Sequence, residues 1–196
     1  KATFEEFLKH RPYADPQFLA GESEVAGENL GDVSATLNAV LNNSFIAIDQ
    51  FFVHGFVFRG HREHAIAQES IGYSILQMGA AYRLAQRILV VGAVPGGQNN
   101  EELRLSYRVV AGQDPAEALQ NDLDLLDRRT AGLERARMLM NEEWDRGSFD
   151  LLSILLAGEA RTREKLRARQ GALAGGTTIG GAGEKFDAML SMWGAG

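Results

Sequence analysis

Residues 92–114 read GAVPGGQNNEELRLSYRVVAGQD, and the length of this segment decides the topology that the sequence predicts. It is the longest stretch without helical periodicity, and its first part is rich in Gly and Pro, which favour loops. About 20 extended residues can reach roughly 60 Å, whereas a helix of about 30 residues is about 45 Å long. The segment is therefore long enough to run from one end of a helical bundle to the other.

Two segments with apolar residues at helical spacing precede this connection, and two follow it. The first two are separated only by RGH (residues 59–61), so they should be antiparallel neighbours. Asp114 and Pro115 give an N-cap followed by proline at the first helical position, which marks the start of the third helix. The expected helices run from Asp32 to about Arg59, from about His61 to Val94, from Pro115 to about Trp144 or Arg146, and from Ser148, as N-cap, to about Gln170. The sequence therefore predicts an all-α four-helix bundle with one long crossover between helices two and three.

The overall composition is that of one soluble globular domain. The 196 residues are 45% hydrophobic and 23% charged, which is enough for a sizeable core. A net charge of −6 without any basic block gives a nucleic-acid partner little support. The chain has no cysteine, so disulfides and thiolate metal sites are excluded, and no apolar run is long enough to predict a membrane span. We expect a cytoplasmic protein, although a leader removed before Lys1 is compatible with the sequence.

Both ends of the chain should lie outside the bundle, which we place at residues 33–170. Residues 1–32 contain Pro12, Pro16 and several glycines, which predict an irregular N-terminal arm. Residues 171–184, GALAGGTTIGGAGE, have the composition of a flexible linker. Residues 185–193, KFDAMLSMW, then place four apolar side chains at helical spacing. This short helix could dock onto a second protein or fold back onto its own chain, and the sequence favours neither.

Two stretches resemble the first two helices of bacterioferritin: LNAVLNNSFIAIDQFFVHGFVF (residues 37–58) and SILQMGAAYRLAQRILVVGAVPGGQ (residues 74–98). A weaker match continues through NDLDLL and LLSILLAGEARTRE, so the resemblance covers roughly residues 35–170. It implies a ferritin-like bundle. The residues that carry it are Leu37, Asn38, Leu41, Asn43, Ala47, Ile48, Gln50, Phe52, His54, Met78, Arg83, Arg87, Ile88, Leu89 and Pro95.

The resemblance also implies where the family's iron-oxidising centre would lie. That centre uses six Glu and His ligands, spread over four helices, to hold two metal ions about 3.5–4 Å apart. The matching positions here are Ser44, Gln77, Ala80, Leu126, Glu159 and Thr162. Only Glu159 is a family ligand, and the chain contains no Glu-x-x-His motif. We therefore expect no ferroxidase activity, and we expect Glu159 to hydrogen-bond to Gln77 or Ser44 because a buried carboxylate needs partners.

Met78 matches the methionine that in bacterioferritin ligates haem at a two-fold interface. The resemblance thus implies haem b shared between two subunits, with Met78 as an axial ligand. Six other residues should form the walls of this site: Phe45, Ile48, Asp49, Phe52, Ile75 and Tyr82. A methionine in an apolar helical stripe is also an ordinary packing residue, so a dry dimer contact stays open. In both cases we expect a homo-dimer or larger oligomer, because the stripe is too apolar to leave in water.

The remaining histidines point to structure rather than to a site. His61 and His64 lie one turn apart near two acidic residues, and we interpret them as a solvated helix start because two ligands make a poor metal site. We interpret His54 as a hydrogen-bonded core or interface residue. The sequence as a whole favours a structural or electron-transfer subunit that binds haem. A scaffold without haem, or an iron-storage shell subunit that relies on other subunits for oxidation, remains the alternative.

Overall fold

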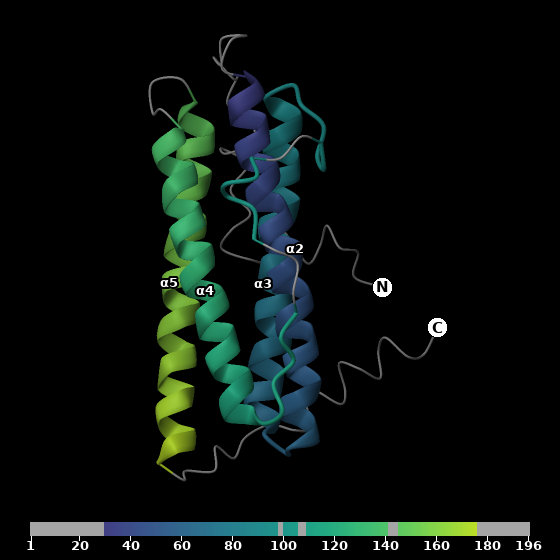
Figure 1. Ribbon diagram of the computed structural model, residues 1–196, viewed down its shortest axis with the longest axis vertical. Coiled ribbons are helices and arrows are strands. Elements are labelled where there is room, and N and C mark those ends of the chain that lie inside the picture. The colour runs from purple at the N-terminus through teal and green to yellow at the C-terminus, as the bar shows by residue number, and fades with distance from the viewer. Residues whose placement is uncertain (1–29, 98–99, 106–108, 141–144, 176–196) are drawn as a thin grey trace, which may run out of the picture.

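Four long helices make up the part of the chain that the structure describes. The structure is a computed structural model, and it describes residues 30–97, 100–105, 109–140 and 145–175. The helices are α2 (Leu30–Gly60), α3 (His64–Val90), α4 (Pro115–Leu139) and α5 (Arg146–Ala174). They lie side by side as a bundle (Figure 1), and the described residues contain no strand. The predicted all-α four-helix bundle is confirmed.

The order of the helices matches the predicted crossover. α2 and α3 form one antiparallel hairpin, and α4 and α5 form another (Figure 1). The connection of residues 91–114 leaves α3 at one end of the bundle and enters α4 at the other. Helices α3 and α4 therefore run in the same direction, as the length of this segment predicted.

Both boundaries of α3 and the end of α4 differ from those expected. α3 begins at His64 rather than His61, because the preceding turn places Arg62 at a φ of 64°. It also ends at Val90 rather than Val94, where Gly92 adopts a φ of 80° and the Ala93 amide donates to the Ile88 carbonyl at 3.0 Å. α4 ends at Leu139, several residues earlier than expected, and Met140 after it is extended.

The start of α4 is as predicted, whereas both ends of α5 are not. The Asp114 carboxylate accepts a hydrogen bond from the Glu117 amide at 2.9 Å, with proline at the first helical position. At α5 the N-cap is Asp145 instead of Ser148, and its carboxylate accepts from the Ser148 amide at 3.1 Å. α5 then continues to Ala174, so residues 171–174 are helical and do not belong to the predicted linker.

The core consists of two apolar clusters, one toward each end of the bundle. The first contains Val33, Leu37, Ala39, Val40, Leu41, Ala81, Leu84, Ile88, Val91, Leu103, Leu133, Ala136, Met140, Leu151 and Leu152. The second contains Ile46, Ala47, Phe51, Phe58, Ile66, Ala67, Tyr73, Ala118, Leu119, Leu123, Leu125, Leu126 and Leu166. On every helix, the residues between the two clusters include buried polar ones. The bundle thus has a polar layer at mid-height.

Three side chains of α2 hold the crossover: Asn38, Asn43 and His54. The Asn38 side chain accepts from the Gly96 amide at 2.7 Å and donates to the Val94 carbonyl at 3.2 Å. Asn43 does the same with the Leu105 amide and the Leu103 carbonyl, both at 2.8 Å. An asparagine that satisfies one amide and one carbonyl in this way replaces the partners that the loop backbone lacks.

His54 makes the third anchor, near the start of α4. Its Nε2 lies 2.6 Å from the Val110 carbonyl oxygen, so Nε2 carries a proton and donates it. Its Nδ1 lies 2.7 Å from Asp122 Oδ1, and Gln50 Nε2 donates to the same oxygen at 3.3 Å. His54 is therefore the hydrogen-bonded core residue that the sequence suggested, and it joins α2, α4 and the crossover.

His54 and Asp122 share a proton in a site without access to solvent, since both side chains are 0% exposed. Burial opposes a charge on His54, but the hydrogen bond and the charge of Asp122 outweigh it and raise the pKa of His54 above its usual 6.5. Burial also raises the pKa of the Asp122 carboxyl, against the opposing hydrogen bond from His54. The pair as a whole therefore keeps its proton to higher pH than an exposed histidine would.

We expect the free energy of unfolding to fall as the pH rises above about 6.5. Above this pH the unfolded chain has released the His54 proton, whereas the folded protein still holds it. The stabilisation from the held proton is therefore fully present below about pH 6.5. It is lost as the pH rises through the pKa of the folded state. Urea denaturation over a pH series measures the slope. The double variant His54→Gln/Asp122→Asn has no titrating group at this site and should lack this component. An unchanged slope in that variant would contradict the assignment.

Candidate functional site

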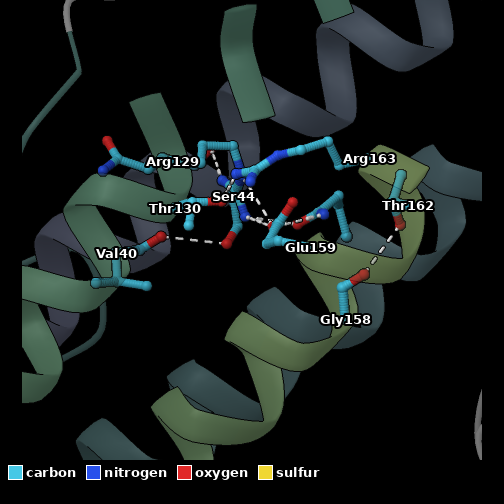
Figure 2. A network of polar contacts seen from close by, with 10 residues as sticks. Val40, Ser44, Arg129, Thr130, Gly158, Glu159, Thr162 and Arg163 are labelled. Carbon is cyan, nitrogen blue, oxygen red and sulfur yellow. Dashed lines mark hydrogen bonds and ion pairs between the residues drawn. The ribbon is translucent and has the colours of Figure 1, made fainter. Parts of the chain in front are cut away.

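The Arg129 guanidinium, projecting from α4, occupies the centre of the polar layer. Its Nε and Nη2 donate to Glu159 Oε1 on α5 at 3.1 and 2.7 Å, as Figure 2 shows from close by. Nη2 also donates to Gln77 Oε1 on α3 at 2.7 Å, and Nη1 donates to the Asn43 carbonyl oxygen on α2. One guanidinium thus binds all three other helices. Arg129 is 3% exposed, so these bonds lie in the interior.

Gln77 and Glu159 complete the arrangement around this cation. Gln77 Nε2 donates to Glu159 Oε1 at 3.0 Å, while the amide oxygen of Gln77 accepts from Arg129. The predicted Glu159–Gln77 hydrogen bond is confirmed. A glutamate at position 77 would add a second negative charge, which the single guanidinium could not balance. The glutamine keeps the cluster neutral and still supplies one acceptor and one donor.

The structure brings together some of the six positions matched to a di-iron centre. Gln77, Ala80, Glu159 and Thr162 line one cavity of about 160 Å³ between α3 and α5. Ser44 is buried on α2, but its hydroxyl donates to the Val40 carbonyl of its own helix at 3.1 Å and not to Glu159. Thr162 likewise bonds its own helix, at the Gly158 carbonyl (Figure 2).

The remaining matched position, Leu126 on α4, does not line this cavity. Leu126 is fully buried in the second apolar cluster. The α4 residue that meets Gln77 and Glu159 is Arg129, which lies about one turn later. In the sequence, Arg129 looks like one more charge in the run DRR (residues 127–129). The available signal was its spacing: Leu119, Leu126 and Leu133 flank it on the buried side of α4, so an arginine there must find partners inside.

The donor set at this layer does not suit a pair of iron ions. Within the described residues, no group of three or more His, Asp or Glu side chains is placed to hold a metal ion. The one carboxylate, Glu159, already binds a guanidinium and an amide through Oε1. Hard divalent cations need several oxygen or imidazole donors. Here the Arg129 guanidinium, a fixed positive charge, lies among the few donors that are present.

His61 and His64, which the sequence predicted to be solvated, are exposed next to the start of α3.

The residues predicted to surround haem do not all share one surface: most are on the outer side of the α2/α3 hairpin, but Ile48 packs against the first apolar cluster and Ile75 also lines the cavity between α3 and α5. Phe45, Phe52 and Tyr82 are 49%, 47% and 39% exposed, and Asp49 is exposed between the two phenylalanines. Three others are half-buried: Ile48, Ile75 and Met78. The Ser74 hydroxyl donates to the Ile48 carbonyl at 2.9 Å, which fixes the register of the hairpin. One turn further along α3, Met78 lies level with the turn of α2 that carries Phe45.

The arm of residues 1–29 and the tail of residues 176–196, including the predicted docking helix at 185–193, lie outside the described residues.

Replacing Arg129 alone should be much more costly than replacing the whole pair. We expect Arg129→Leu to lower the free energy of unfolding by about 3–5 kcal/mol, because Glu159 is left as a buried charge without its cation. The double variant Arg129→Leu/Glu159→Leu should recover most of that loss, since neither charge remains. Arg104→Leu, which removes an exposed ion pair with Glu101, should change stability by less than about 1 kcal/mol. Chemical denaturation measures all three, and equal losses in the single and double variants would refute a buried ion pair.

A comparison with known protein families agrees with this architecture. No helix in the described part of the chain is long and apolar enough to span a membrane. The model of the ferritin-like domain matches residues 34–173, which takes in all four helices and the crossover. A ferritin-like domain is typical of an iron-storage type of family. This chain belongs to the ferritin-like domain family.

Proposed function

We propose that this chain is a ferritin-like subunit in which an internal salt bridge has replaced the iron-oxidising centre. The contacts of Arg129 carry the proposal. Its guanidinium binds Gln77 and Glu159, two of the positions matched to the family's metal ligands. A side-chain cation therefore holds the helices together where the family's metal ions would do so. On this view the subunit has a structural or electron-transfer role and is not a ferroxidase.

Electrostatics supports this reading. Two unit charges about 4 Å apart interact by about 4 kcal/mol at an effective dielectric constant of 20, so an Fe²⁺ ion at that distance would be repelled by about 8 kcal/mol. Glu159 attracts a cation about as strongly as Arg129 repels it at the same distance, so the neutral pair gives an Fe²⁺ ion no net attraction that could replace its hydration. Expelling the guanidinium would break its bonds to three helices. Iron as a substrate is thus disfavoured at this layer.

Oxygen consumption during addition of Fe²⁺ tests the absence of ferroxidase activity. We expect the purified protein to consume oxygen no faster than a protein-free control at the same pH. Glu159→Ala should leave that rate unchanged. A saturable rate above background that Glu159→Ala abolishes would show a working centre and would overturn the proposal. A saturable rate that survives Glu159→Ala would place iron oxidation at a different site and would equally contradict a non-catalytic subunit.

We further propose that two subunits meet through the outer α2/α3 face and hold haem b between them. Met78 fits the role of axial ligand because its thioether is half-buried and is flanked by aromatic rings that two copies would bring together. Phe45, Phe52 and Tyr82 would cover the faces of a flat macrocycle. When bound, a thioether-ligated haem supplies a low-spin one-electron carrier of raised potential. The chain's own part is to exclude water and to fix the sulfur atoms.

The visible spectrum of protein expressed with ample haem tests this assignment. We expect a Soret band with about one haem for two chains. Met78→Ala should abolish or shift that band, while the dimer persists in analytical ultracentrifugation. Met138→Ala is the matched control, because Met138 lies 76% exposed on α4 and should leave the spectrum unchanged. A colourless wild-type protein would rule out haem ligation.

The exposed aromatic face favours one alternative. The same side chains could form a dry dimer contact, in which Met78 only packs and the chain acts as a scaffold within a larger assembly. The scaffold reading predicts a colourless dimer that Phe52→Lys dissociates. An iron-storage shell subunit that depends on other subunits for oxidation would instead retain iron only after mixing with a catalytic subunit.

A further inference from the structure

An open groove runs along the seam between α3 and α5. The cavity of about 160 Å³ beside Gln77 and Glu159 is one part of it. A second hollow of about 420 Å³ continues toward Glu69 and Arg169. Tyr73, Leu76 and Lys165 line both, so the two hollows form one groove. Its remaining walls are largely apolar, with Ile75, Ile154 and Leu155.

Two buried polar atoms at this groove have no hydrogen-bond partner among the described residues. They are Glu159 Oε2 and Tyr73 Oη. Glu159 is 3% exposed and Tyr73 is 6% exposed, so water around the protein does not compensate them fully. Burial raises the pKa of Tyr73 to about 12, so the phenol is neutral and can donate or accept. Buried polar atoms normally have partners, and these two face a groove with space for one.

We propose that residues 185–193 of the same chain form a short helix that lies in this groove. The reach is sufficient. Residues 176–184 form a tether of about 30 Å when extended. Lys165 and Gly158 both line the groove. At 1.5 Å per residue along α5, the helix ends at Ala174, about 14 Å beyond Lys165 and about 24 Å beyond Gly158. A chain that turns back after Ala174 thus brings KFDAMLSMW alongside both hollows.

The chemistry of the segment complements the groove. Phe186, Met189, Leu190 and Trp193 follow the spacing of one helical face, which suits apolar walls. The rim carries the basic side chains of Arg83, Arg161 and Lys165, together with an Arg169–Glu69 ion pair. Residues 184–193 contain two acidic side chains, Glu184 and Asp187, and one basic one, Lys185. The Trp193 indole N–H is a donor without acceptor capacity. It is therefore suited to the open acceptor, Glu159 Oε2.

Cross-linking in the full-length chain tests the proposal. The chain has no native cysteine, so only the introduced thiols can react. One variant combines Ala80→Cys, in the groove, with Met189→Cys, in the tail. The control combines Met189→Cys with Ala131→Cys, an exposed position on α4 outside the groove lining. With a short thiol-specific cross-linker, we expect cross-linked monomer from the first pair and several-fold less from the control.

The other results would overturn the proposal. Cross-linked dimer in place of monomer would show that the tail occupies the groove of a second copy. Equal, low yields from both pairs would mean that the tail does not lie in the groove and is free for another protein. Tryptophan emission gives an independent check, because Trp144→Phe leaves Trp193 as the sole tryptophan. We expect blue-shifted emission that Leu76→Arg shifts back to the red. Emission typical of an exposed indole would contradict the docked helix.

Discussion

The buried guanidinium of Arg129 is the interaction on which the architecture depends. From α4 it binds Glu159 on α5, Gln77 on α3 and the Asn43 carbonyl on α2. It therefore fixes the relative height of all four helices at one level. Apolar clusters above and below could slide along the helix axes at modest cost, whereas a fully buried charge cannot leave its partners without a penalty of several kcal/mol. Buried ion pairs often add little net stability, and specifying register is one use attested for them.

At each end of the bundle, a different set of polar contacts holds the two hairpins together. At the end where α3 stops, Arg87 pairs with Asp145, the N-cap of α5, and Arg87 Nε donates to the Ser148 hydroxyl at 3.1 Å. A Cβ on Gly147 would lie 2.6 Å from the Arg87 guanidinium, so a larger residue would displace that group from its partners. At the other end, His54 and Asp122 join α2 to α4. The α3/α5 seam between these points has few contacts of its own, which leaves the groove open.

The separation of two surfaces on α3 follows from helical geometry. Gln77 points into the bundle and Met78 points outward, about a hundred degrees away. Replacing the inner ligands by an ion pair therefore leaves the outer face untouched. A ferritin-like subunit can lose one of these sites and keep the other, and the proposed haem contact and the salt bridge can be tested independently.

Local signals were sufficient for much of this protein. Periodicity and loop length predicted four helices and a crossover, and Asp114 with Pro115 located the start of α4, because these features depend on neighbours in sequence. Asn38, Asn43 and His54 were recognised as markers of a family resemblance. Their shared role, holding the crossover against α2, is visible only once the partners at residues 94–110 are placed.

The sequence by itself determined the helical bundle, the long crossover and the lack of a Glu-x-x-His motif, since each is a property of composition or spacing. Only the tertiary structure decided that Arg129, not Leu126, meets Gln77 and Glu159. One turn of difference on α4 exchanges a leucine for an arginine. Sequence spacing cannot resolve that turn, because the register of a helix in a bundle is set by packing against the other three. It was likewise the packing of α3 against α5 that left a groove beside two unpaired polar atoms.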